Sequence, residues 1–185
     1  MKVLLVSDLA DTGFGRVGRE LGTGLIAKGH DLRAIGINWR GVIGEVERRY
    51  RKIETGTVAE RLDSAVAKVK QDPLLDVTIP ADLHGDGQGT NLTPAALTGR
   101  LWPKWIPEAV VFVADPQSLL IRLANDNGFV GMSAQKGMKF FNYVPIEGEP
   151  LPLDYRRIWQ FVTPVAMREY GQGVLSTLLE REVPL

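Results

Sequence analysis

A glycine-rich segment near the start of the chain holds the first residues whose types and spacing could do chemistry. Residues 13–18 read Gly-Phe-Gly-Arg-Val-Gly, the spacing of loops that hold phosphate groups with backbone N–H groups. Gly13, Phe14 and Gly15 would stand at the start of a helix, where the helix dipole favours an anion. Arg16 could donate two hydrogen bonds to the same phosphate. The segment predicts contact with a phosphate or a sugar, although glycine there also suits a tight turn and close helix packing.

Three carboxylates follow apolar runs that have the composition of buried strands. Asp11, Asp115 and Glu147 each come shortly after such a run. Ligands of open parallel sheets gather beyond the C-terminal ends of the strands, so these side chains are expected on the ligand side. A carboxylate there can accept hydrogen bonds from sugar hydroxyls or act as a base, which makes Asp115 and Glu147 candidate catalytic residues. Asp115 precedes Pro116, however, and would equally suit the N-cap of a helix.

A histidine between two carboxylates is a third candidate catalytic group. His84 lies between Asp82 and Asp86 in a glycine-dense stretch, residues 80–93, that predicts a ligand-facing loop. The histidine could form a proton-transfer couple with either carboxylate, or all three could be solvated loop residues. One histidine with two aspartates does not make a structural zinc site, and we expect no metal.

Strands and helices must position these residues, and their patterns predict one Rossmann-like domain over residues 1–185. An apolar run at 2–8 is typical of a strand buried on both faces, and apolar residues at steps of three and four predict a helix over 14–28. A second strand at 32–37 completes a β-α-β unit. Further strands are expected at 76–79, 109–114, 138–144 and 159–162 and helices at 58–69, 92–102, 117–125 and 163–178, with no element predicted at 45–52. This alternation predicts an α/β fold, an open and mostly parallel sheet with helices on both faces.

Composition argues against several classes of partner. The 22 basic and 22 acidic residues give a formal net charge of zero, so no global field would hold a nucleic acid. The absence of cysteine excludes a disulfide framework and a cysteine nucleophile, and it agrees with a cytoplasmic location. No run approaches the roughly 20 apolar residues that span a bilayer, so no transmembrane segment is expected.

The glycine motif also raises the alternative of an NAD-dependent oxidoreductase domain. In dinucleotide folds the first glycine follows the strand almost at once, and an acidic residue closes the second strand to hold the ribose. Here residues 9–12 separate the strand from Gly13, and the second strand closes with Ile37, Asn38 and Trp39. These departures make a dinucleotide site the less favoured alternative.

Several segments share their pattern with one enzyme family. Three of them open the chain: the first strand, the glycine turn and a helix end that reads Gly-His-Asp-Leu. The fourth leads into a strand and reads Ile-Pro-Glu-Ala-Val-Val-Phe. The fifth is a strand that ends in Pro-Ile-Glu-Gly, and the sixth reads Val-Thr-Pro-Val-Ala-Met-Arg-Glu-Tyr. They occupy residues 1–7, 12–21, 25–32, 105–112, 141–148 and 161–171. Together they resemble the N-terminal domain of GT-B fold glycosyltransferases of the retaining, group 1 or family 4-like type. The resemblance spans essentially the whole chain.

The resemblance implies an acceptor-side domain of a nucleotide-sugar-dependent hexosyltransferase. The nucleotide-sugar would be a co-substrate, with no bound cofactor, and the acceptor a small molecule or glycan. Family members hold the donor chiefly with a C-terminal domain whose paired-glutamate motif is not found in this sequence. A donor-binding domain or partner is therefore expected, and the isolated chain is expected to be inactive. The expected substrate and donor contacts are Gly13, Phe14, Gly15, Arg16, Asp11, Asp115 and Glu147.

A second hypothesis is a non-catalytic Rossmann-like binding or interaction module. It is supported by the lack of a complete catalytic constellation in the sequence.

Overall fold

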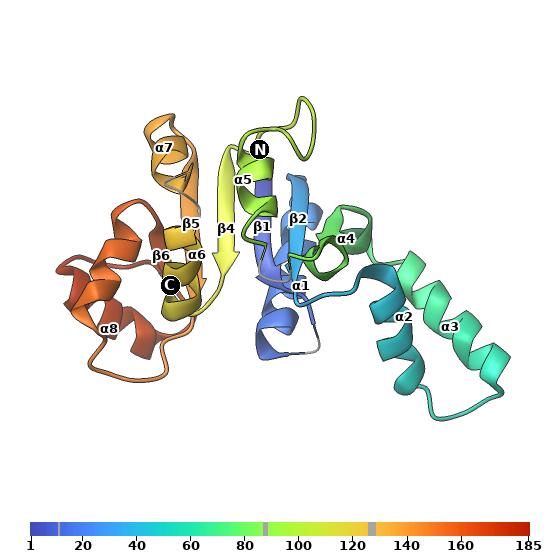
Figure 1. The fold of residues 1–185 in the computed structure, drawn as a ribbon. Helices are drawn as coiled ribbons and strands as arrows, with labels where there is room; N and C mark the ends of the chain where they lie inside the picture. The colour runs from blue at the N-terminus through green and yellow to red at the C-terminus, as the bar shows by residue number, and fades with distance from the viewer. Residues whose placement is uncertain (11, 87–88, 126–128) are drawn as a thin grey trace.

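Six parallel strands form one sheet in the described part of this protein (Figure 1). The computed structural model describes residues 1–10, 12–86, 89–125 and 129–185. The strands are Lys2–Asp8 (β1), Asp31–Ile37 (β2), Thr78–Pro80 (β3), Ala109–Val113 (β4), Lys139–Val144 (β5) and Thr163–Ala166 (β6), in the order β3-β2-β1-β4-β5-β6. The order reverses between β1 and β4, as in Rossmann folds. The predicted α/β fold with an open parallel sheet is confirmed.

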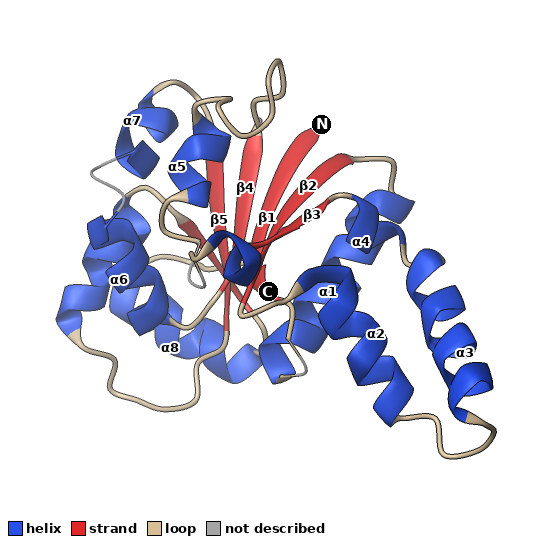
Figure 2. Ribbon diagram, turned by 45° about the vertical axis from the view of Figure 1, so that its right-hand side comes forward, coloured by secondary structure: helices blue, strands red, loops and turns tan. Residues whose placement is uncertain are grey.

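Helices cover both faces of the sheet, also as predicted (Figure 2). The α-helices are Gly13–Ala27 (α1), Gly41–Arg51 (α2), Val58–Lys70 (α3), Pro73–Asp76 (α4), Leu92–Leu97 (α5), Pro116–Asn125 (α6), Phe129–Gln135 (α7) and Glu169–Leu179 (α8), with 3-10 helices at Ala81–His84 (η1) and Leu153–Gln160 (η2). Leu4 and Val6 of β1 lie in a core shared with α5, α6, α7, α8 and η2, whereas Val3 and Leu5 lie in a core shared with α1 and α4. Successive side chains of a strand point to opposite faces, so the apolar run of β1 serves both cores.

Helices α2 and α3 form a hairpin that projects away from the sheet in both views. Helix α3 confirms the predicted helix at 58–69. The prediction that no element lies at 45–52 is wrong, because α2 runs through this segment to Arg51. The buried position in the middle of α2 is filled by Glu45, whose side chain is 2% exposed. A charged residue at the buried position interrupts the apolar period by which a helix is recognised.

The last strand lies later in the chain than its predicted place. Residues 159–162, predicted as a strand, are the end of η2 and the turn after it, and Thr163–Ala166, predicted to begin a helix, is β6. A threonine followed by proline has the composition of a helix start, but Pro164 is tolerated in β6 because β6 is an edge strand. Helix α8 therefore begins only at Glu169.

Helix α5 is shorter than predicted. It ends at Leu97 rather than near residue 102, and Gly99 follows with a left-handed φ of 73°. Such a glycine ends a helix because a residue with a Cβ rarely adopts this conformation.

The last residues of the chain lie along the outer edge of β6. The backbone N–H of Ala166 donates to the carbonyl of Pro184 at 2.9 Å, and the side chain of Gln172 donates to the carbonyl of Val183 at 2.8 Å. Val183 is 1% exposed. We call residues 183–185 the C-terminal tail.

Helices long and apolar enough to cross a bilayer are absent from the described part of the chain.

Candidate functional site

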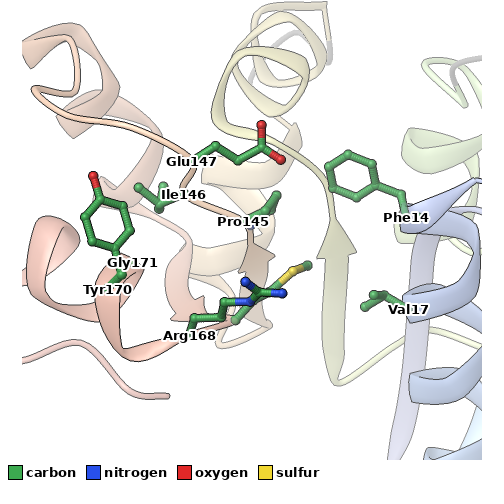
Figure 3. Close-up of a pocket in the computed structure, with 10 residues that line it drawn as sticks. Phe14, Val17, Pro145, Ile146, Glu147, Arg168, Tyr170 and Gly171 are labelled. Atoms are coloured by element: carbon green, nitrogen blue, oxygen red, sulfur yellow. The ribbon is translucent and has the colours of Figure 1, made fainter.

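A cleft of about 600 Å³ lies at the C-terminal edge of the sheet. One wall is the start of α1, and the other is formed by the segments that follow β5 and β6. Phe14 and Val17 lie on one side in Figure 3, with Arg168 and Tyr170 on the other. The lining residues are Gly13, Phe14, Val17, Pro145, Ile146, Glu147, Met167, Arg168, Tyr170 and Gly171. Ligands of open parallel sheets bind at this edge, near the point where the strand order reverses.

The N-termini of two helices, α1 and α8, meet this cleft. The Thr12 hydroxyl accepts a hydrogen bond from the N–H of Gly15 at 2.9 Å and so caps α1. No described residue accepts a hydrogen bond from the N–H groups of Gly13 or Phe14. Arg168 stands at the N-cap of α8 and forms no ion pair with a described residue. Two helix dipoles and a guanidinium therefore favour an anion in the cleft.

Glu147 and Asp115 line a second cavity, of about 350 Å³, that continues from the cleft. The two cavities share Phe14 and the segment 145–147, and the second also includes Tyr155. Glu147 is exposed, so its carboxylate can accept hydrogen bonds from a ligand's hydroxyl groups. The structure thus brings four of the predicted site residues to one continuous hollow: Gly13, Phe14, Asp115 and Glu147.

Asp115 serves as the N-cap of α6. One carboxylate oxygen accepts from the N–H of Ser118 at 2.9 Å, and the other accepts from the Ser118 hydroxyl. The predicted capping role is present, and Asp115 remains half-buried at the rim of the second cavity.

Two glycines of the motif serve packing. A Cβ added to Gly15 would lie 1.9 Å from the carbonyl oxygen of Ala10, and one added to Gly18 would lie 2.1 Å from the hydroxyl of Ser7. Both distances are far inside van der Waals contact, so α1 can lie this close to β1 and to the loop after it only with glycine at these positions. Gly15 is buried and does not line the cleft, whereas Gly13 is exposed and has no atom within 4 Å of an added Cβ.

Besides Gly15, three predicted residues lie apart from this hollow or outside the described residues. Arg16 is exposed and pairs with Glu20 at 3.0 Å on the outer face of α1. His84 is exposed at the end of η1 and lines neither cavity. Asp11 lies outside the described residues.

Asp86 organises the loop in which His84 was expected to act. Its carboxylate is buried and accepts from the N–H groups of Thr90, Asn91 and Leu92 at 2.8–2.9 Å and from the Thr90 hydroxyl at 2.9 Å. Four donors occupy this carboxylate. It therefore holds residues 90–92 in place and is not available as a proton-transfer partner of His84. No group of metal-ligating side chains is found among the described residues.

Sequence reasoning missed two residues of the site, for different reasons. Arg168 stands two residues beyond β6, but placing the strand at 159–162 puts it inside a helix. Asn142 is fully buried in β5, and its side-chain amide donates to the carbonyl of Ala114 at 3.0 Å, next to Asp115. Its Oδ1 accepts from the indole of Trp159 at 3.4 Å. The sequence signal for these hydrogen bonds was a polar residue on the core side of an apolar strand.

Among the described residues, the end of β2 offers no free carboxylate for a dinucleotide ribose. Asn38 there has a left-handed φ of 51°, and the next carboxylate along the chain, Glu45, is buried between Arg48 and Arg49.

No known protein-family model matches this chain, and no curated protein sequence matches it.

Proposed function

We propose that this protein is the acceptor-side domain of a nucleotide-sugar-dependent glycosyltransferase that acts in the cytoplasm. The observation that carries the proposal is the cleft in which an exposed helix start, at Gly13 and Phe14, faces Arg168 and Glu147. Such a site combines donors for a phosphate with an acceptor for sugar hydroxyls. The sequence resemblance to GT-B enzymes agrees with this chemistry.

In this proposal, some residues of the cleft contact the donor and others contact the acceptor. The N–H groups of Gly13 and Phe14 and the guanidinium of Arg168 approach the diphosphate of the donor. Glu147 accepts hydrogen bonds from hydroxyl groups of the acceptor, and Phe14 and Tyr170 supply apolar surface for sugar rings. A C-terminal domain or a partner holds the rest of the nucleotide-sugar, and the cleft closes between the two.

The test uses a matched pair of glycine substitutions in α1. Gly13→Val adds a side chain in the cleft, and Gly24→Val adds the same side chain on an exposed part of the helix; neither added Cβ meets an atom within 4 Å. Release of nucleoside diphosphate from a panel of nucleotide-sugars is measured for this chain alone and for the complete product of its gene. We expect Gly13→Val to lower the rate of transfer by about tenfold or more, because one or two charge-assisted hydrogen bonds to the phosphate would be lost. We expect Gly24→Val to leave the rate unchanged.

Two outcomes contradict the proposal. One is the absence of nucleoside diphosphate release with every nucleotide-sugar and acceptor. The other is equal transfer by the Gly13→Val and Gly24→Val variants.

The second candidate is a non-catalytic binding module. It is favoured by the absence, among the described residues, of a hydrogen bond that joins a carboxylate of the cleft to a histidine or to another carboxylate. For this candidate, calorimetry would show that a nucleotide-sugar or sugar phosphate binds, Gly13→Val would weaken that binding, and no turnover would occur.

A further inference from the structure

A groove separate from the cleft lies between α2 and the loop that joins β1 to α1. It has a volume of about 450 Å³, within the range of small-molecule sites. Leu9 and Ala10 form its loop side, whereas Gly13 and Phe14, at the start of α1, line the cleft. Arg40, Arg48, Arg51 and Lys52 are its basic residues. We call this space the α2 groove.

Among its described lining residues, the α2 groove has more basic than acidic side chains. Glu45 and Glu47 are the carboxylates in this set, and Arg40, Arg48, Arg51 and Lys52 are the cations. Glu45 is fully engaged, because Arg48 and Arg49 both pair with it. The other described carboxylate of the groove, Glu47, is the one that lies between the exposed arginines Arg40 and Arg51.

Two arginines share Glu47. Arg40 lies 3.6 Å from one carboxylate oxygen, and Arg51 pairs with the other. Their side chains are 65% and 73% exposed. Each guanidinium carries five N–H donors, so one shared carboxylate leaves most of these donors facing water.

The start of α2 has the reverse of the usual charge preference. Its N-cap is Arg40, no side chain caps it, and its first turn contains no acidic residue. A helix start normally has a capping oxygen or an acidic side chain, because its N–H groups carry partial positive charge. A cation at this position is unfavourable for the isolated helix and becomes favourable when an anion lies beside it.

A buried donor in the wall of the α2 groove also has no acceptor. Trp39 is 4% exposed, and its indole N–H finds no hydrogen-bond partner among the described residues. A buried N–H without a partner costs about 1–3 kcal/mol.

We propose that the α2 groove binds the phosphate group of a phosphorylated small molecule through Arg40 and Arg51. The phosphate displaces Glu47 from one or both arginines and lies beside the uncapped start of α2. Planar guanidinium groups match phosphate oxygens in pairs, which favours phosphate over a neutral sugar. The inference does not rest on the proposed transferase function, since a different set of residues lines the cleft.

The experiment is calorimetric titration of the whole chain with glucose 6-phosphate, inorganic phosphate and glucose. We expect saturable binding of glucose 6-phosphate, competition by inorganic phosphate, and no binding of glucose. The double substitution Arg40→Gln and Arg51→Gln should weaken the binding by about tenfold or more, as expected for lost charge-assisted hydrogen bonds.

The matched control removes two exposed arginines elsewhere, Arg16→Gln and Arg157→Gln, and should change the dissociation constant by less than about twofold. Thermal melting shows that each variant is folded, and the two single substitutions, Arg40→Gln and Arg51→Gln, replace the double one if it is not. Three results would each overturn the proposal: no saturable binding of a phosphate compound, equal binding by the double variant and the wild type, or binding lost in Arg168→Gln instead. The last result would move the phosphate to the cleft and leave the proposed function standing.

Discussion

Glu45 holds two arginines of α2, and one of them, Arg49, joins the helical hairpin to the body of the protein. Its carboxylate accepts from Arg48 and from the Nε of Arg49 at 3.0 Å, and Arg49 also pairs with Asp72 at 3.1 Å, just before α4. Burial by itself would raise the pKa of Glu45, but the hydrogen bonds and charges of Arg48 and Arg49 outweigh burial and hold the pKa below its ordinary value. The charged form of Glu45 is therefore the form that the fold stabilises.

This network predicts a pH-dependent contribution to stability. Glu45→Gln should lower the free energy of unfolding by about 2–3 kcal/mol at neutral pH, because two arginines lose their anionic partner. The folded state binds the proton of Glu45 less readily than the unfolded state does. The stabilisation is therefore complete above the ordinary pKa of 4.5 and is lost as the pH falls through the lower pKa of the folded state.

Urea denaturation of the wild type and of Glu45→Gln, at neutral and at strongly acidic pH, measures this effect. The difference between the two proteins should shrink at acidic pH, and the exposed Glu54→Gln is a control that should behave as the wild type. A difference that does not change with pH would contradict the assigned role.

At the scale of elements, the glycines of α1 decide how closely the helix lies against β1. Gly18→Ala should lower the free energy of unfolding by about 2–3 kcal/mol, because its Cβ would collide with Ser7 and force α1 away from the strand. Gly24→Ala is the matched control on the same helix: its Cβ is unobstructed, so better helix propensity should raise the free energy of unfolding by about 0.5–1 kcal/mol. Chemical denaturation of both variants measures the two effects, and destabilisation of equal size in both would refute the packing role.

The sequence predicts those elements whose buried positions are filled by apolar residues. β1, β4 and β5 are such strands, and α1 and α3 show a regular apolar period, so their predicted places are confirmed. Helix α2 is hidden because Glu45 takes the buried position. The place of β6 cannot be read locally, because Pro164 fits either a helix start or an edge strand, and only the neighbouring strand decides between them.

The site is predictable to the same degree. Glu147 and Asp115 follow confirmed strands, so the rule about strand ends puts them on the correct edge. Arg168 follows the strand that was misplaced and is missed with it. The role of Gly15 in packing depends on Ala10, which approaches it only in the folded chain.

At the scale of the whole molecule, the C-terminal tail closes one side of the sheet. Val183→Asp should lower the free energy of unfolding by about 2–3 kcal/mol, because a buried valine would be replaced by a charge and the tail would leave β6. Leu185→Asp, at a residue that is 61% exposed, is the control and should have little effect. Thermal melting measures both, and an unchanged melting temperature for Val183→Asp would show that the tail contributes nothing to the fold.

The tail also bears on how copies of this protein avoid one another. An unpaired strand edge is a template on which a second chain can add a strand, and this leads to aggregation. At the β6 edge the N–H of Ala166 is already occupied by Pro184. At the other edge β3 is only three residues long and ends in Pro80, which has no N–H to donate. Each edge of the sheet thus withholds a backbone N–H from a second chain, and losing the tail would free the N–H of Ala166 for such pairing.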